Sequence, residues 1–272
     1  MMSTAAIMRT AAAVRSPSDL FFDQLCGAKS RVLLLDYDGT IAPFSVRRDR
    51  AFPYPTIPEL LDCIMSTCCT RVALVSGRTA REIPPLLGLN PHPEIWGTYG
   101  IERLSADGEY SVGHVSGAAQ RALAKADLWL QQEPGLERLI ELKPGALAVH
   151  WRGLNPTQVE EVKAAAYRAM SPFASADLLL SEFDGGLELR PRSRSKADVV
   201  RALLSENDRE AAIAYLGDDT TDEDAFRALN GRGLTVLVRP KYRFTAAQKW
   251  IRPPEDLIVF LTEWLRACGG DM

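Results

Sequence analysis

The sequence predicts an α/β protein whose parallel-sheet core is interrupted by an inserted α+β unit. Short apolar runs alternate with helical patterns from residue 31 onward, and this alternation is typical of βαβ units that build a parallel sheet. The same alternation returns near residue 190, whereas the stretch between follows a different order of elements. A chain of 272 residues is long enough to bury the core of one large or two modest domains.

The core is expected to begin with two strands, each followed by a helix. The strands are expected at residues 32–35 and 72–75, and the helices at 59–66 and 80–87. Both strands are apolar at consecutive positions, as strands are when helices cover both faces of a sheet. This first part of the core, placed at residues 31–103, therefore contains a central, buried sheet.

The second part of the core is expected at residues 190–272. Its predicted elements, in chain order, are a helix at 196–204, a strand at 212–216, a helix at 222–229, a strand at 234–238 and a helix at 256–266. Because this order continues that of the first part, the two stretches are predicted to form one α/β domain. Residues 1–30 are expected to form an N-terminal tail or an additional helix.

Residues 104–189 are predicted to form the inserted α+β unit. The expected elements are a turn at 107–108, a helix at 118–132, strands at 139–142 and 146–151, a helix at 156–170, and strands at 178–183 and 186–189. Pro156 directly after Asn155 is typical of the first turn of a helix, and Asp184-Gly185-Gly186 is typical of a hairpin turn. The unit is therefore expected to combine a small sheet with helices.

The composition disfavours several classes of partner. Lys and Arg together number 32 and Asp and Glu 35, which gives a net charge of −3 and no basic surface for a nucleic acid. No apolar stretch approaches the roughly 20 residues that a membrane-spanning helix needs. The five cysteines, odd in number and without CxxC spacing, favour reduced thiols and a cytoplasmic location. No nucleic-acid, membrane or protein partner is therefore implied.

Two acidic residues follow the first predicted strand directly. The strand at 32–35 leads into Asp36-Tyr37-Asp38-Gly39-Thr40, and the strand period of two points Asp36 and Asp38 in roughly the same direction. Both carboxylates are expected at the carboxyl end of the sheet, where open α/β folds bind ligands. Gly39 allows the chain to turn sharply around a bound group. The alternative is a strand-ending Asp-Gly turn without a functional role.

A second acidic cluster follows the strand at 212–216. Its sequence is Gly217-Asp218-Asp219-Thr220-Thr221-Asp222-Glu223-Asp224. A capping box formed by Thr221 and Asp224 would account for the end of this cluster but not for Asp218 and Asp219. If the two acidic strand ends are neighbours, their carboxylates repel one another unless a cation neutralises them. Oxygen ligands of this kind favour Mg²⁺.

Groups suited to bind a phosphoryl group follow two other predicted elements. Ser76-Gly77-Arg78 comes directly after the strand at 72–75 and offers a hydroxyl and amide donors. The stretch 191–197, just ahead of a helix, contains Arg192, Arg194 and Lys196, and any one of these is able to neutralise the charge of a phosphate or of the nucleophile. A carboxylate nucleophile, a second carboxylate for proton transfer, a cation and these donors together indicate phosphoryl transfer through an aspartyl phosphate. No GxxxxGK[ST] motif occurs, which disfavours a P-loop nucleotide hydrolase.

These four motifs resemble, in order, those of the haloacid dehalogenase (HAD) superfamily of phosphatases. The stretch 217–224 closely resembles the GDDxTDED motif of the trehalose-6-phosphate phosphatase family. In the insertion, Glu141-Leu142-Lys143, His150-Trp151-Arg152 and Glu188-Leu189-Arg190-Pro191 resemble the ExK, HYR and ExRP patterns of that family. The resemblance extends from about residue 31 to residue 265 and implies a Rossmann-like, parallel-sheet HAD core with an inserted α+β cap domain.

The resemblance also implies a role for each matching residue. Asp36 would attack phosphorus, Asp38 would protonate the leaving sugar oxygen and then activate water, and Lys196 would complete the catalytic set. The implied phosphate-binding residues are Thr40, Ser76, Gly77 and Lys196. The implied substrate-binding residues are Arg78, Glu141, Lys143, His150, Arg152 and Glu188. The implied Mg²⁺ site comprises Asp36, Asp38 through its backbone carbonyl, and Asp218, with Asp219 and Asp222 nearby or acting through water. The implied reaction is hydrolysis of the small-molecule sugar phosphate trehalose 6-phosphate.

The chain departs from the family pattern in three segments. Asp184 stands where the GKxxxE pattern has lysine, and Lys249 stands where TxAxYxL has tyrosine. The family's GSHG corresponds to Gly97-Thr98-Tyr99-Gly100, so its histidine is missing. The change at Asp184 reverses a charge that is expected to face the substrate, so it bears on the identity of the sugar rather than on the hydrolytic residues.

Two alternative functions stay open. One is a phosphatase of another glycosyl or sugar phosphate, and the other, from a different class, is a non-catalytic sugar-phosphate-binding protein. The complete set of Asp36, Asp38, Lys196 and Asp218 disfavours the second, because decay of catalysis is expected to remove at least one of them. A phospho-accepting receiver domain is disfavoured by the length of the chain and by its large insertion.

Overall fold

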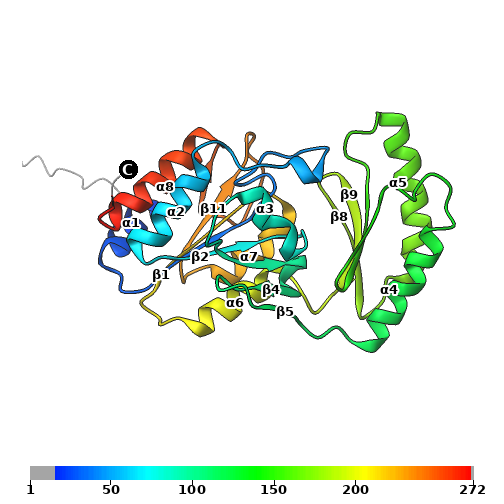
Figure 1. Ribbon diagram of the computed structural model, residues 1–272, viewed down its shortest axis with the longest axis horizontal. Coiled ribbons are helices and arrows are strands. Elements are labelled where there is room, and N and C mark those ends of the chain that lie inside the picture. The colour runs from blue at the N-terminus through cyan, green and yellow to red at the C-terminus, as the bar shows by residue number, and fades with distance from the viewer. Residues whose placement is uncertain (1–15, 271–272) are drawn as a thin grey trace, which may run out of the picture.

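A computed structural model of the protein describes residues 16–270, whose strands form two sheets (Figure 1). In the larger core sheet the strands follow the order β12-β11-β10-β1-β2-β3-β4-β5. Their bounds are Lys249–Ile251 (β12), Leu234–Val238 (β11), Ala212–Gly217 (β10), Arg31–Leu35 (β1), Arg71–Val75 (β2), Glu94–Gly97 (β3), Glu102–Leu104 (β4) and Tyr110–Val112 (β5). Neighbours from β12 to β3 are parallel, and β4 and β5 add an antiparallel edge. The core strands β1, β2, β10 and β11 confirm the four strands predicted there.

Helices cover both faces of the core sheet. One face is covered by α1 (Pro17–Gly27), α2 (Ile57–Cys68), α3 (Ile83–Leu87) and α8 (Glu255–Ala267), and the other by α6 (Lys196–Glu206) and α7 (Glu223–Leu229). Alternate residues of β1 contact the two faces: Leu33 and Leu35 pack with α2 and α8, whereas Val32 and Leu34 pack with α6 and α7. This arrangement explains why the strand is apolar at consecutive positions.

The helix α1 supplies part of the N-terminal region that was expected as a tail or an additional helix. Ser16 and Asp19 form a capping box at its start, in which each side chain accepts a hydrogen bond from the backbone N–H of the other residue. Phe21 packs against Trp264 of α8, with 5.7 Å between their ring centroids. The remainder of that region, residues 1–15, lies outside the described residues.

The smaller sheet is antiparallel and has the order β6-β7-β9-β8. It comprises β6 (Ile140–Lys143), β7 (Ala146–His150), β8 (Leu178–Phe183) and β9 (Gly186–Pro191), and α4 (Gly117–Leu130) and α5 (Pro156–Met170) pack on it. These helices lie on the side away from the core (Figure 1). Leu147 and Val149 of β7 pack beneath them, so Ala148 and His150 face the core. We call residues 117–191 the insert.

The hairpin of β4 and β5 lies in the core sheet. The expected turn at 107–108 joins these strands, but Leu104 of β4 pairs with Ile95 of β3, and Val112 of β5 pairs with Glu102 of β4. The boundary expected after residue 103 therefore falls inside β4, and the one expected after residue 189 falls inside β9. A local turn pattern does not reveal which sheet its two strands join, and this is why the hairpin was assigned to the insertion.

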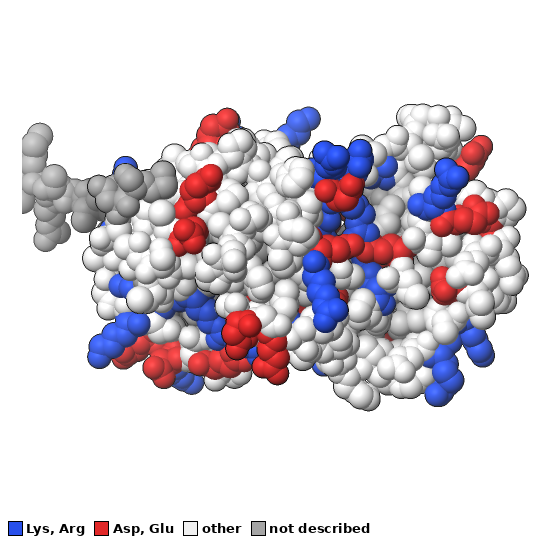
Figure 2. Space-filling view, viewed as in Figure 1, with Lys and Arg blue, Asp and Glu red and all other residues white. Residues whose placement is uncertain are grey.

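The core and the insert meet along a charged junction. Figure 2 shows side chains of both charge signs gathered between the two parts of the molecule. No helix within residues 16–270 is long and apolar enough to cross a bilayer.

Candidate active site

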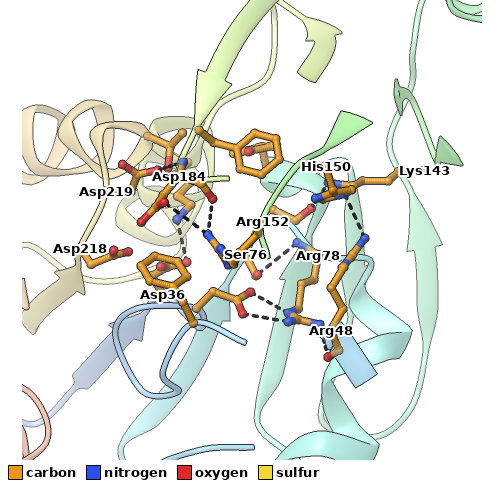
Figure 3. A pocket seen from close by; sticks show the side chains of 17 residues that line it. Asp36, Arg48, Ser76, Arg78, Lys143, His150, Arg152, Asp184, Asp218 and Asp219 are labelled. Atoms are coloured by element: carbon orange, nitrogen blue, oxygen red, sulfur yellow. Dashed lines mark hydrogen bonds and ion pairs between the residues drawn. The ribbon is translucent and has the colours of Figure 1, made fainter. Parts of the chain in front are cut away.

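A pocket opens between the carboxyl ends of the core strands and the inner face of the insert (Figure 3). Most of the residues that sequence motifs assigned to the site line this pocket. They are Asp36, Asp38, Ser76, Gly77, Arg78, Lys143, His150, Arg152, Lys196, Asp218 and Asp219. The other four, Thr40, Glu141, Glu188 and Asp222, do not line it; Glu141, Glu188 and Asp222 contact residues that do.

Strand register brings the two acidic motifs together. β1 lies between β10 and β2, with Leu35 beside Leu216, and the backbone N–H of Asp36 donates to the Leu216 carbonyl at 2.9 Å. The acidic residues that follow β1 and β10 therefore emerge side by side. Gly39 has a φ of +85°, and a Cβ there would lie 2.3 Å from Asp218 Oδ2. Glycine at this position is required both by the left-handed backbone and by the approach of Asp218.

Three buried carboxylates form the acidic centre. Asp36, Asp218 and Asp222 each place one carboxylate oxygen within 4.8 Å of the others. Burial raises the pKa of Asp36 to about 7; Lys196 opposes this effect and Asp222 reinforces it. Burial and the neighbouring charge of Asp36 also raise the pKa of Asp218 well above its usual range. Carboxylates crowded in this way ionise readily only when a cation neutralises them.

Asp222 is already saturated with hydrogen bonds. Its Oδ1 accepts from Lys196 Nζ at 2.8 Å and from the Tyr215 hydroxyl at 2.6 Å. Its Oδ2 accepts from the backbone N–H groups of Asp218 and Asp219, at 3.1 and 3.0 Å. Asp222 therefore orients the strand end and Lys196 rather than offering a free ligand. Lys196 also donates to Asp36 Oδ1 at 2.7 Å, and although burial acts to lower the pKa of Lys196, Asp222 and Asp36 raise it.

Asp218 does offer a free ligand atom. Its side chain is buried, and Oδ1 has no hydrogen-bond partner. A buried carboxylate oxygen without a partner, beside the carboxylate of Asp36, fits a hard divalent cation such as Mg²⁺. The capping box of Thr221 and Asp224, considered as an alternative explanation of this cluster, does not form; Asp219 instead caps the turn η5 (Thr220–Asp222) in a box with Asp222.

Arg78 holds Asp38 in the pocket. Arg78 Nε donates to Asp38 Oδ2 at 2.6 Å and Nη2 donates to Oδ1 at 2.8 Å. The loop that contains Arg78 is fixed by Ser76, whose Oγ accepts from the Arg78 backbone N–H at 3.1 Å. The Thr40 hydroxyl oxygen is buried without a partner. Ser76 lines the pocket and therefore has hydrogen-bonding capacity for a bound anion, whereas the unused capacity of Thr40 lies outside the pocket lining.

Two carboxylates of the insert have oxygens without partners. Glu188 is fully buried; its Oε1 accepts from Lys143 Nζ at 2.7 Å, and its Oε2 has no partner. Lys143 also donates to the Gly77 carbonyl at 2.8 Å and so joins the insert to the phosphate-binding loop expected in the core. Glu141 Oε1 likewise has no partner. These two oxygens therefore have unused capacity to accept hydrogen bonds.

Arg48 was not identified from the sequence. It lies in η1 (Arg48–Arg50) and pairs with Glu141, while its Nη1 lies 3.3 Å from His150 Nε2. Burial acts to raise the pKa of Glu141, but the hydrogen bond from His150 and the charges of Lys143 and Arg48 lower it to about 2. The run 47–50 carries charges of both signs, a composition typical of a solvated surface, so nothing in it distinguishes Arg48 from its neighbours.

Arg152 links the insert to the core. Its Nη2 donates to the carbonyl of Asp184, and its guanidinium lies 4.1 Å from the centroid of the Phe44 ring. The backbone N–H of Asp184 lies 3.4 Å from Asp219 Oδ2. Asp184 itself lines the pocket (Figure 3). The position at which the chain departs from the family lysine is thus part of the pocket wall.

Tyr99 was noted only as a departure from the family pattern, and it also lines the pocket. Thr98 and Tyr99 have φ values of 46° and 56°, which are uncommon for residues other than glycine. Their backbone N–H groups donate to the carbonyls of Arg78 and Ser76 at 2.8 and 3.0 Å. The Arg190 guanidinium lies 4.7 Å from the centroid of the Tyr99 ring. The flanking glycines were the only local sign of this conformation.

The sequence matches one family model over most of its length. The model is described as trehalose-phosphatase and matches residues 34–247. A trehalose-phosphate phosphatase of Mycobacterium tuberculosis is 30% identical over 223 residues, which cover 78% of this chain and 54% of the relative. Trehalose-phosphate phosphatase B of Arabidopsis thaliana is 30% identical over 296 residues, which cover 97% of this chain and 75% of the relative. The chain thus spans about half the length of the mycobacterial relatives.

Solved structures show the same fold at lower sequence identity. The C-terminal domain of a trehalose-6-phosphate phosphatase from C. albicans superposes with a TM-score of 0.73 at 21% identity, covering 96% of this chain and all of that one. The C-terminal domain of a Candida albicans trehalose synthase regulatory protein superposes with a TM-score of 0.69 at 13% identity, covering 92% of this chain and 99% of that one. A HAD-superfamily phosphatase from Bacteroides thetaiotaomicron superposes with a TM-score of 0.59 at 14% identity, covering 96% of this chain and 99% of that one. The core is therefore a HAD fold.

Proposed function

The chain belongs to the trehalose-phosphatase family, and we propose that it is a Mg²⁺-dependent phosphatase that hydrolyses trehalose 6-phosphate to trehalose and phosphate. The main support is the pairing of Asp36 with Lys196 in the acidic centre, directly opposite the polar face of the insert. We also propose that the insert acts as a cap, the role that the resemblance implied for residues 104–189, and that the enzyme works in the cytoplasm, as the cysteine pattern favours.

In this proposal Asp36 is the nucleophile. One of its oxygens attacks phosphorus, the bond from phosphorus to the sugar oxygen breaks, and an aspartyl phosphate forms. Water then attacks phosphorus, and Asp36 leaves as a carboxylate. Lys196, whose Nζ lies 2.7 Å from Asp36 Oδ1, is placed to offset the negative charge of the phosphoryl oxygens, with Ser76, Thr40 and the Gly77 backbone as further donors.

Asp38 is the proposed acid and base. It gives a proton to the departing sugar oxygen in the first half-reaction and takes one from the attacking water in the second. Asp36, Asp218 and the backbone carbonyl of Asp38 are the proposed ligands of Mg²⁺. When bound there, Mg²⁺ would neutralise the crowded carboxylates and polarise the phosphoryl group. Asp222 and Asp219 support this site from the neighbouring turn, because Asp222 is saturated by other donors.

The insert favours a sugar as the leaving group. The unpartnered oxygens of Glu141 and Glu188 are acceptors, and sugar hydroxyls are donors that match them. Lys143, His150, Arg152 and Arg78 complete the proposed substrate-binding set. A phosphatase of another glycosyl phosphate would use the same chemistry and differ only in these contacts.

The second candidate is a non-catalytic sugar-phosphate-binding protein. One observation favours it: a protein named as a regulatory protein has the same fold, so the fold alone does not establish catalysis. The complete set of Asp36, Asp38, Lys196 and Asp218 at one strand edge favours the enzyme instead.

Phosphate release over a panel of sugar phosphates, with an aryl phosphate for comparison, tests the proposal. We expect Mg²⁺-dependent release that is fastest from trehalose 6-phosphate and is abolished by a chelator and by Asp36→Asn. Because asparagine keeps an oxygen that accepts from Lys196, this variant should fold. If phosphate is released fastest from another sugar phosphate, that compound rather than trehalose 6-phosphate is the substrate. Binding of trehalose 6-phosphate without any release would favour the non-catalytic alternative.

A further inference from the structure

The segment that joins β11 to β12 packs against the residues that follow the β10 strand end. Arg243 lies in this segment and donates to the backbone of Asp218 and Asp219. Its Nη2 donates to the Asp219 carbonyl at 2.7 Å, and its Nε donates to the Asp218 carbonyl at 3.4 Å. Arg243 is absent from the pocket lining, so it does not reach a bound substrate there.

Glu223 fixes the position of Arg243. Glu223 Oε1 accepts from Arg243 Nη1 and, at 2.8 Å, from the Thr245 hydroxyl. Its Oε2 accepts from the Ala246 backbone N–H at 2.8 Å. Glu223 is buried at the first position of α7, directly after the turn that contains Asp222. One carboxylate therefore ties the β11–β12 segment to the helix that follows the acidic motif.

The backbone of Asp218 is thus fixed at both its N–H and its carbonyl. Asp222 accepts from the Asp218 backbone N–H, and a Cβ at Gly217 would lie 2.4 Å from the Asp222 carboxyl carbon. The Asp218 carbonyl accepts from Arg243 and, at 3.2 Å, from Arg239 Nη1, which also lies 3.8 Å from Asp218 Oδ2. The carboxylate of Asp218 projects from this clamped backbone with its Oδ1 unpartnered.

We propose that Arg243, held by Glu223, which is itself held by Thr245, is a positioning residue for the divalent cation and acts by fixing the backbone from which Asp218 reaches it. The inference rests on the proposed function, which supplies the cation. Groups that hydrogen-bond to metal ligands from outside orient those ligands, and their replacement typically lowers metal affinity by about 10- to 100-fold.

Calorimetric titration of the full-length protein with Mg²⁺, without substrate, tests the proposal. Arg243→Met keeps the aliphatic stem and removes every donor, and it should raise the Kd for Mg²⁺ by about 10- to 100-fold. Thr245→Val removes one hydrogen bond to Glu223 and should raise the Kd by roughly two- to tenfold. Arg252→Met, which removes an exposed arginine paired with Asp256, is the matched control and should leave the Kd unchanged.

A second readout separates positioning from general damage to the fold. Saturating Mg²⁺ should restore most of the turnover of Arg243→Met on an aryl phosphate, whereas a distorted fold would not recover. A Kd within about twofold of wild type in a folded Arg243→Met protein overturns the inference. If that variant does not fold, an unchanged Kd in Thr245→Val overturns it. Absence of Mg²⁺ binding by the wild type overturns both this inference and the cation in the proposed function, while phosphate release from the panel tests the rest of that function separately.

Discussion

Arg78 occupies both carboxylate oxygens of Asp38, with Nε 2.6 Å from Oδ2 and Nη2 2.8 Å from Oδ1. The guanidinium is itself buried, and its third nitrogen donates to the Arg48 carbonyl at 3.0 Å. Both oxygens of Asp38 are thus engaged by one cation. In the proposed mechanism, release of Asp38 from Arg78 would free it for proton transfer, and a bound phosphate or sugar would offer Arg78 alternative acceptors.

Replacing Asp38 is expected to impair both catalysis and stability. Asp38→Asn should lower turnover by about 10²- to 10⁴-fold, because general acid and base catalysis is lost. It should also lower the free energy of unfolding by about 1.5–3 kcal/mol, because the buried Arg78 loses its anionic partner. Phosphate-release kinetics and urea unfolding measure the two effects.

The double variant Asp38→Asn with Arg78→Met separates these effects. Removing the arginine as well should recover stability, because no buried charge is left unpaired, but it should not recover turnover. Substantial turnover by Asp38→Asn alone would contradict the acid and base role. Equal stability of Asp38→Asn and wild type would show that the ion pair contributes little to folding.

Replacing Glu188 is expected to damage recognition of the sugar and to spare the chemistry. Glu188→Gln replaces one acceptor by an amide donor, so a hydroxyl that donated to it loses its partner in a buried site. We expect kcat/KM for trehalose 6-phosphate to fall by about 10- to 100-fold. An aryl phosphate, which makes no sugar contacts, should be hydrolysed almost as before.

The matched control is another glutamate paired with lysine on the insert. Glu182 pairs with Lys163 at 2.7 Å, and both side chains are substantially exposed. Glu182→Gln should leave the rates of hydrolysis of trehalose 6-phosphate and of the aryl phosphate unchanged. Similar losses on both substrates in Glu188→Gln would mean that Glu188 supports the fold of the site, through Lys143, rather than the sugar.

The contribution of Glu141 to stability should depend on pH. Its pKa in the folded protein is lowered from 4.5 to about 2: burial opposes this, but His150, Lys143 and Arg48 outweigh it. A carboxyl whose pKa is lower in the folded protein stabilises the fold at pH values above its pKa in the unfolded chain. This stabilisation is lost as the pH falls toward its pKa in the folded protein. The contribution is at most about 3 kcal/mol, present above about pH 5 and lost as the pH falls toward 2.

Urea unfolding of wild type and Glu141→Gln at several pH values checks this prediction. Glutamine cannot ionise, so the difference in free energy between the two proteins should be largest near neutral pH and shrink as the solution becomes acidic. A difference that stays constant with pH would show that Glu141 stabilises the protein by shape rather than by charge.

The sequence predicted the part of the site that follows from strand topology. Asp36, Ser76 and Asp218 each follow an apolar run, and parallel strands end at the same edge of a sheet. The proximity of these residues could therefore be predicted from the order of the elements alone. The family resemblance added the positions in the insert, including Lys143 and Glu188. These residues could be assigned because their roles depend on short local patterns.

Residues whose roles depend on distant loops could not be found in this way. Arg48 reaches Glu141 across the junction of core and insert, and Arg243 reaches Asp219 from a separate loop, so neither has a local pattern. Tyr99 lines the pocket in a left-handed backbone that local propensity disfavours. For the same reason the hairpin of β4 and β5 was assigned to the insertion: its turn is local, whereas its sheet partners are not.

The departure at Asp184 is expected to affect the choice of substrate. Its carboxylate lines the pocket, 3.6 Å from Arg152, and offers only acceptors, whereas a lysine would offer only donors. If this position faces the substrate, as the resemblance implies, a sugar hydroxyl that would accept from lysine would have to donate to Asp184 here. We therefore expect trehalose 6-phosphate to be hydrolysed with weaker discrimination against related disaccharide and monosaccharide phosphates than the family pattern implies.

Asp184→Lys, compared with Asp184→Asn over the sugar-phosphate panel, tests this expectation. The lysine should sharpen the preference for trehalose 6-phosphate because it restores a donor, although its charge will also repel Arg152 and lower overall activity. Asparagine removes the charge without adding a cation, so it separates loss of the carboxylate from gain of the lysine. The backbone contacts of Asp184 with Arg152 and Asp219 are available to all three residues. If the ratio of kcat/KM values across the panel is the same in all three proteins, Asp184 serves only as the start of the hairpin turn, and the choice of sugar depends on other residues.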